Sequence, residues 1–163
     1  MSVGSLRFLS LCRETLGRGY SLRCRTLGSS MFPLLKTGSV IHVEPVTAAD
    51  LRPGDVMVYQ RAGEAVVAHR LVQKSWKHGR LTLLARGDSF SRPAQEYVTP
   101  EQVLGRVVAV EWGKGMEIRI DAGWGRALGI ILAAIAPLAW RVAPALSRIK
   151  GSLKPFWMGR TQS

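Results

Sequence analysis

Residues 56–74 read VMVYQRAGEAVVAHRLVQK and hold two runs of β-branched and apolar side chains around a short polar segment with a glycine. Runs of this kind, bounded by turn residues, are typical of strands that pair as a hairpin. We therefore predict strands over Val56–Gln60 and Ala65–Lys74. The second run places His69 in its most continuously apolar part.

The same pattern continues on both sides of this stretch, from Ser39 to Asp121. Turn signals such as Arg52-Pro53-Gly54-Asp55 separate the runs, and their even spacing favours hairpins in a coiled or barrel-like sheet over βαβ units. The fold class we predict is therefore mostly β. The further strands expected are Val40–Val46, Arg80–Arg86, Gln102–Trp112 and Met116–Asp121.

The two ends of the chain differ from this middle part. Residues 3–17 have the spacing of a short amphipathic helix. Their apolar run Phe8–Cys12 is shorter than the ~7–15 residues of a secretory signal, so we expect neither a cleavable export signal nor an N-terminal membrane span. Ala127–Trp140 is free of charged residues, which predicts a hydrophobic helical segment.

A spanning helix needs about 20 apolar residues, and that length is reached only by extending the C-terminal run to Leu146, across Arg141 and two prolines. A tilted or interfacial insertion is favoured over a clean span, and a helix hairpin packed on the sheet is the alternative. The expected organisation is thus an N-terminal amphipathic segment (1–25), a β domain (26–121) and a hydrophobic, basic segment (122–163) that could serve as a membrane anchor.

The formal net charge of +12 is unevenly distributed. Residues 1–30 carry five Arg and one Glu, residues 31–121 carry twelve Lys or Arg against ten Asp or Glu, and residues 122–163 carry six basic residues and no acid. A nearly neutral middle without aromatic-basic interleaving argues against a nucleic-acid partner. Basic ends fit a membrane surface, so we expect membrane association, on a side that the sequence leaves open.

Cysteine usage gives no sign of a metal centre. Cys12 and Cys24 do not form a CxxC pair, and no His or Cys cluster accompanies them. A zinc site is therefore not expected, and no cofactor is expected either.

Gly28-Ser29-Ser30-Met31-Phe32-Pro33 places a serine on a glycine-led turn before the first predicted strand. Acyl transfer needs a nucleophile together with donors aimed at the developing oxyanion, and such turns can present both. Ser30 is the candidate nucleophile. Ser29 and Met31, which flank it, are the candidates for oxyanion or substrate binding.

A serine hydroxyl needs a base near neutral pH, and histidine is the side chain already poised there. The chain has three. His42 lies in an alternating strand and His78 in a turn, whereas His69 lies in an apolar strand where an unpaired ring would be costly. We pair His69 with Ser30 and expect kcat/KM to fall as the pH drops through a pKa of about 6–7.

The corner Gly87-Asp88 ends a predicted strand and could return a carboxylate to this pair. Asp88 could orient His69 as the third member of a triad does. An Asp after Gly is also a common turn residue that bonds its own backbone. Both interpretations remain open.

Five motifs, in this order along the chain, resemble those of the signal peptidase I and LexA-like serine peptidases. The similarity covers roughly residues 26–112 and lies in Gly28-Ser29-Ser30-Met31-Phe32-Pro33, Leu51-Arg52-Pro53-Gly54-Asp55-Val56, Ala68-His69-Arg70-Leu71-Val72, Arg86-Gly87-Asp88 and Val103-Leu104-Gly105-Arg106-Val107. Bacterial signal peptidases and LexA-type proteins use a Ser–Lys dyad, whereas endoplasmic-reticulum and archaeal signal peptidases have His in place of the lysine. This sequence is similar to the His type.

The resemblance implies a mostly-β signal-peptidase-like domain and endoproteolysis through an acyl-enzyme on Ser30, with His69 as general base. The implied substrate is an extended peptide or precursor protein, docked beside a sheet edge. His-type enzymes place a second acid soon after the Gly-Asp corner, so the third catalytic residue is either Asp88 or Glu96. Gly28-Ser29 replaces the family's Ser-Gly, which leaves the backbone N–H of Ser30 as the oxyanion donor.

Two other functions are compatible with the sequence. A catalytically inactive β module could bind membranes or partners through the basic ends. A LexA-like self-cleaving regulator is less favoured, because about 25 residues before the first motif leave no room for a helix-turn-helix reader.

Overall fold

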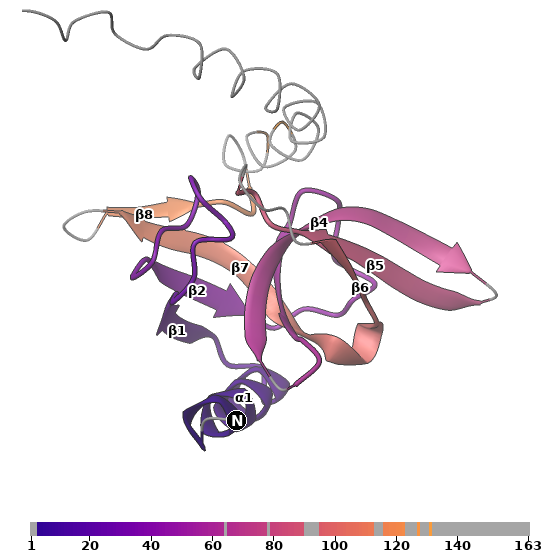
Figure 1. Ribbon diagram of the computed structural model, residues 1–163, viewed down its shortest axis with the longest axis horizontal. Helices are drawn as coiled ribbons and strands as arrows, with labels where there is room; N and C mark the ends of the chain where they lie inside the picture. Colours follow the sequence, from indigo (N-terminus) through magenta and orange to yellow (C-terminus); the bar gives the residue numbers. More distant parts are fainter. Residues whose placement is uncertain are drawn as a thin grey trace, which may run out of the picture.

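The computed structural model describes residues 3–63, 65–77, 79–89, 95–112 and 116–122, together with the single residues 127 and 131. In this part of the chain one α-helix, α1 (Val3–Gly17), precedes a sheet of eight strands (Figure 1). The strands are β1 (Leu22–Arg25), β2 (Val40–Glu44), β3 (Val56–Gln60), β4 (Val66–Lys77), β5 (Arg80–Arg86), β6 (Gln95–Val98), β7 (Val103–Trp112) and β8 (Met116–Arg119), with a 3₁₀ turn, η1 (Pro100–Gln102), before β7.

All strand pairs are antiparallel, and the order across the sheet is β1-β2-β7-β3-β4-β5-β6, with β8 paired to β7. Register shifts interrupt the β2–β7, β3–β7 and β4–β5 pairings. Such bulges bend and twist the strands that carry them, which lets a sheet of this size curl. The predicted mostly-β fold with a short N-terminal helix is confirmed.

Helix 3–17 and the strands over 56–60 and 80–86 have the predicted bounds, and four other predicted strands differ only at their ends. β1 and β6, of four residues each, were not predicted. The segment expected to be a hydrophobic anchor lies outside the described residues, apart from 122, 127 and 131, and His78 lies outside them too. Within the described part of the chain, no helix combines the length and apolar character needed to cross a bilayer.

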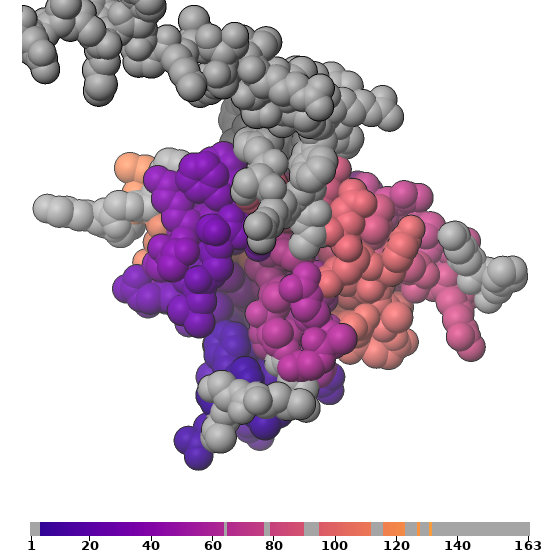
Figure 2. Space-filling model, in the orientation of Figure 1, coloured from indigo at the N-terminus to yellow at the C-terminus, as the bar shows by residue number. Residues whose placement is uncertain are grey.

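Two hydrophobic clusters hold the sheet together. The first joins α1 to the sheet through Cys12 and Leu16, which are buried with residues of β2, β3 and β7. α1 can approach closely because a Cβ on Gly105 of β7 would lie 2.7 Å from the carbonyl oxygen of Glu44 and 3.3 Å from Leu16. Figure 2 shows α1, in indigo, projecting from one end of the molecule.

The second cluster lies under β3, β4 and β5 and includes Met57, Tyr59, Leu71 and Leu83, all almost fully buried. The first half of β4 alternates between the clusters, since Val66 and Ala68 pack against the first and Val67 against the second. The first half of β4 is thus packed on both faces, and a polar residue at its end, His69, is removed from water.

Candidate active site

Ser30 lies on a compact turn between β1 and β2. Backbone hydrogen bonds from Phe32 to Ser29 (3.1 Å) and from Leu35 to Met31 (2.9 Å) close the turn, and the Phe32-Pro33 peptide is cis. Met31 is buried in the first cluster, whereas Ser29 is exposed and Ser30 half-buried. The turn is therefore fixed by its buried methionine while the serine hydroxyl stays within reach of solvent.

His69 faces this serine from β4. Its Nε2 lies 3.1 Å from the Oγ of Ser30, within the range in which a base can accept a serine proton. The imidazole is only 2% exposed. The two residues that the sequence paired are thus in hydrogen-bond contact, 39 positions apart along the chain.

The other ring nitrogen of His69, Nδ1, contacts a tyrosine, whereas the sequence predicted a carboxylate, from Asp88 or Glu96, as the third member of the site. Nδ1 lies 2.9 Å from the hydroxyl of Tyr59, which also bonds to a carboxylate oxygen of Glu96. The second carboxylate oxygen of Glu96 accepts a hydrogen bond of 2.7 Å from Nε of Arg61. A continuous chain of contacts therefore runs from Ser30 through His69 and Tyr59 to Glu96.

Sequence reasoning missed Tyr59 because Val56–Gln60 was predicted only as a strand and no role was considered for its side chains. A signal was available: a buried tyrosine usually finds a partner for its hydroxyl. Met57 pairs with His69 and Tyr59 pairs with Val67 in the β3–β4 register. Tyr59 and His69 are therefore diagonal neighbours on one face of the hairpin.

Asp88, the other candidate for the third position, is engaged elsewhere. Its two carboxylate oxygens accept hydrogen bonds from Arg70, at 2.9 Å from Nε and 2.5 Å from the terminal nitrogen. The same guanidinium donates to the carbonyl of Gly54 at 2.7 Å. Both side chains are at least 96% buried. Asp88 thus forms a buried ion pair, and the nitrogen of His69 that a third member would contact bonds to Tyr59 instead.

The turn interpretation of Gly54-Asp55 is confirmed. Gly54 has a φ of +98°, a conformation that glycine adopts at no steric cost. The carboxylate of Asp55 accepts a hydrogen bond of 2.8 Å from the backbone of Arg52.

Among the histidines, His42 bonds to Glu111 at 2.8 Å. No group of three potential metal ligands occurs within the described ranges.

Gly87 packs directly on the backbone of the nucleophile. A Cβ at this position would lie 2.6 Å from the carbonyl oxygen of Ser30, closer than van der Waals contact allows. The same oxygen accepts a hydrogen bond of 2.9 Å from the backbone of Ser89. The corner after β5 therefore holds the Ser30 turn in place.

We expect Gly87→Ala to lower kcat/KM for peptide cleavage by about 10²-fold, because the added methyl group displaces Ser30 and misplacing a reacting group by about 1 Å costs that much. Steady-state kinetics on a fluorogenic peptide measure it. Gly17→Ala is the control, because Gly17 lies at the end of α1 and a Cβ there meets nothing within 4 Å. Equal losses in Gly17→Ala and Gly87→Ala would contradict the steric explanation.

Burial governs the titration of His69. Removal from water lowers its pKa to about 4; the positive charge of Arg61 acts in the same direction and the negative charge of Asp88 opposes both. This pKa is lower than the value of about 6–7 at which the sequence predicted the fall in kcat/KM. The difference arises because the first half of β4 is packed on both faces. His69 is neutral, and able to accept a proton, throughout the neutral range.

We expect kcat/KM to stay flat from pH 7 to about 5.5 with respect to His69 and to fall as the pH drops through about 4, where the base becomes protonated. A pH profile of peptide cleavage measures this limb. Circular dichroism at each pH, and recovery of activity on return to pH 7, separate titration from acid unfolding. A midpoint near 6.5 in a folded enzyme would contradict a desolvated base.

An apolar cavity of about 730 Å³ opens beside Ser30. Its walls come from α1, β1, β2, β3, the Ser30 turn and the first half of β4, and Arg25 is the one charged residue among the described residues that line it. Representative wall residues are Phe8, Cys12, Leu27, Met31, Val66 and Ala68. The cavity is suited to uncharged side chains.

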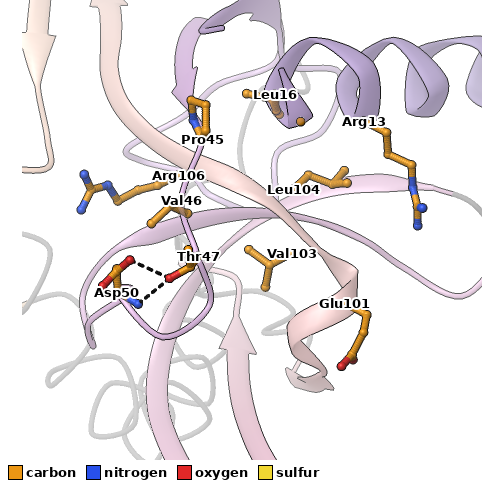
Figure 3. A pocket seen from close by; sticks show the side chains of 11 residues that line it. Arg13, Leu16, Pro45, Val46, Thr47, Asp50, Glu101, Val103, Leu104 and Arg106 are labelled. Atoms are coloured by element: carbon orange, nitrogen blue, oxygen red, sulfur yellow. Dashed lines mark hydrogen bonds between the residues drawn. The ribbon is translucent and has the colours of Figure 1, made fainter. Parts of the chain in front are cut away.

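A second cavity, of about 770 Å³, lies where α1 meets β7 and the loop after β2. Figure 3 shows that its charged side chains diverge: the guanidinium groups of Arg13 and Arg106 lie on opposite sides, and Glu101 points away from both. Asp50 is bonded to Thr47 at 2.6 Å. These groups do not converge on a common point, so the cavity lacks the arrangement of a reactive centre.

No protein-family model matches the chain. The chain is 31% identical over 86 residues to Signal peptidase I W of Bacillus subtilis (strain 168), a match that covers 52% of this chain and 45% of the relative. The chain thus spans less than half the length of that relative. The similarity connects the chain with signal peptidases and supports, at a coarse level, a peptidase-like function.

Proposed function

We propose that this protein is a serine endopeptidase of the signal-peptidase type, with Ser30 as nucleophile and His69 as general base. The observation that carries the proposal is the 3.1 Å contact between the Ser30 hydroxyl and Nε2 of a buried, neutral His69, at the mouth of an apolar cavity. The partial similarity to a signal peptidase supports the same class of reaction. Use of His in place of Lys is part of the proposal.

The reaction follows from the two side chains. Ser30 Oγ attacks the scissile carbonyl carbon while its proton passes to Nε2 of His69, which then donates that proton to the leaving amine. An acyl-enzyme on Ser30 remains. Water then attacks the acyl carbonyl and loses a proton to Nε2 of His69. The bond to Ser30 Oγ breaks, His69 returns that proton to Oγ, and the carboxylic acid product is released with the Ser30 hydroxyl restored.

The oxyanion needs donors that are in place before the reaction. We assign this task to the backbone N–H of Ser30, on the turn that Met31 and Gly87 hold from two sides. Ser29 is exposed beside it and available for substrate contact. The buried Met31 contributes to the floor of the cavity.

The substrate class follows from the edge of β4. Residues 66–69 pair with β3 on one side, whereas the pairing with β5 begins at Arg70 in the described register. No strand pairs with residues 66–69 on this side in the described part of the chain, so an extended peptide can add there by backbone hydrogen bonds and place alternate side chains into the cavity. Uncharged residues next to the scissile bond of a peptide or precursor protein fit these walls.

A fluorophosphonate probe tests the assignment. The probe phosphonylates serines activated by a base, and we expect intact-mass and peptide-mass analysis to place one label on Ser30. Ser30→Ala and heat-denatured protein should remain unlabelled, and Ser75→Ala, in which a half-buried serine of β4 is lost, should label fully. Labelling that persists in Ser30→Ala would exclude Ser30 as the nucleophile.

A further inference from the structure

We propose that Tyr59 and Glu96 act together as positioning residues that hold His69 in the tautomer able to accept the proton of Ser30. This inference rests on the proposed function and adds to it two residues that support the base from behind. The observation is the chain of contacts from Nδ1 of His69 to the Tyr59 hydroxyl, and from there to the Glu96 carboxylate.

Proton counting fixes the direction of every bond in this chain. An ionised carboxylate only accepts hydrogen bonds, and a tyrosine hydroxyl has a single proton to donate. The hydroxyl proton of Tyr59 therefore goes to Glu96, and its oxygen accepts a proton from Nδ1 of His69. Nε2 is then unprotonated, with its lone pair directed at the hydroxyl of Ser30 3.1 Å away.

The partners of Glu96 favour its ionised form. Arg61 donates a charge-assisted hydrogen bond to its second oxygen at 2.7 Å. Burial works in the opposite direction and raises the pKa of Glu96, so the arginine and the tyrosine hydroxyl both serve to stabilise the carboxylate. The side chains of Arg61 and Glu96 are partly exposed, whereas Tyr59 is 1% exposed.

The arrangement also explains how a deeply desolvated imidazole can become charged during the reaction. As His69 takes the proton of Ser30, the positive charge on its ring faces the oxygen of Tyr59, whose proton leans toward Glu96. The carboxylate thus stabilises the imidazolium through one intervening hydroxyl. Nδ1 keeps its proton throughout, and neither Tyr59 nor Glu96 gains or loses one.

Kinetics of two variants form the first arm of the test. We expect Tyr59→Phe, which keeps the aromatic ring and removes only the hydroxyl, to lower kcat about 10²-fold with KM unchanged, because the base loses its orientation and not its substrate. Glu96→Gln removes the charge and should lower kcat about tenfold. The matched controls are Tyr97→Phe and Glu117→Gln, both exposed, and both should retain the wild-type kcat.

Nitrogen-15 NMR of His69 forms the second arm, measured in the full chain carrying Ser30→Ala so that catalysis is not needed. We expect the Nδ1–H tautomer near pH 7, and its loss to a mixture when Tyr59→Phe is added. Assignment uses the resonance that disappears in His69→Gln.

The two arms separate failure of the positioning role from failure of the proposed function. If wild-type protein cleaves through Ser30 while Tyr59→Phe keeps both kcat and the Nδ1–H tautomer, the positioning role is overturned and the peptidase assignment stands. If the probe does not label Ser30, the peptidase assignment is overturned, and the tautomer measurement still tests whether Tyr59 orients His69. If Tyr59→Phe does not fold, Glu96→Gln decides, since an unchanged kcat in that variant also overturns the positioning role.

Discussion

His69→Ala is expected to lower kcat for peptide cleavage by about 10⁴- to 10⁶-fold, the range of losses on removing single members of a serine peptidase triad, with the base at the upper end. Without the imidazole, the proton of Ser30 has no acceptor 3.1 Å away, and the hydroxyl returns to its weak intrinsic reactivity. KM should change little, because the cavity walls that bind substrate are untouched. Single-turnover measurement with an excess of enzyme gives the residual rate.

Three further variants make this result specific. Ser30→Ala should lose as much as His69→Ala, and the double variant should lose no more than either, because residues that act as one unit are not additive. His42→Ala is the matched control, since His42 is partly exposed on β2 and bonds to Glu111; it should retain full activity. Undiminished cleavage by His69→Ala would assign the base to another group.

Asp88→Ala is expected to lower the free energy of unfolding by about 3–5 kcal/mol, the cost typical of leaving one member of a buried ion pair without its partner. Arg70 would remain inside the protein with its charge uncompensated, since its side chain is only 3% exposed. Urea unfolding followed by circular dichroism measures the change. A loss of activity should accompany it, because Asp88 directly follows Gly87 on the corner that braces Ser30.

Replacing both partners separates stability from chemistry. Arg70→Met combined with Asp88→Leu should recover much of the lost stability, because apolar replacement of a buried pair is often neutral or stabilising. Glu14→Ala removes an exposed ion pair with Arg18 and should cost well under about 1 kcal/mol. Wild-type stability in Asp88→Ala together with a complete loss of cleavage would instead give Asp88 a direct part in the reaction.

The fold could be predicted wherever a strand carried its own signal. Val56–Gln60 and Arg80–Arg86 are bounded by turns and contain enough apolar residues to be recognised from sequence, and both have the predicted bounds. β1 and β6 could not be found this way. Each has only four residues and no fully apolar run, and each exists because a longer neighbouring strand offers its edge.

The candidate site could be predicted only for groups whose chemistry is visible one residue at a time. Ser30 and His69 were paired because a serine on a glycine turn needs a base and a histidine in an apolar strand needs a partner. Tyr59, in contrast, gains its position from the register of β3 against β4. The lower pKa of His69 depends on packing around both faces of β4, a property of the assembled sheet.

The brace that Gly87 and Ser89 form on the Ser30 turn also sets when during synthesis such a site could first exist. The segments that meet there are spread from residue 30 to residue 96, and β6 joins the sheet only through β5. A growing chain that has not yet reached Ser89, or a chain in which β5 and β6 have detached from β4, has the serine but lacks the corner that positions it. Incompletely synthesised chains would thus lack proteolytic activity, and unfolded copies would not cleave neighbouring proteins.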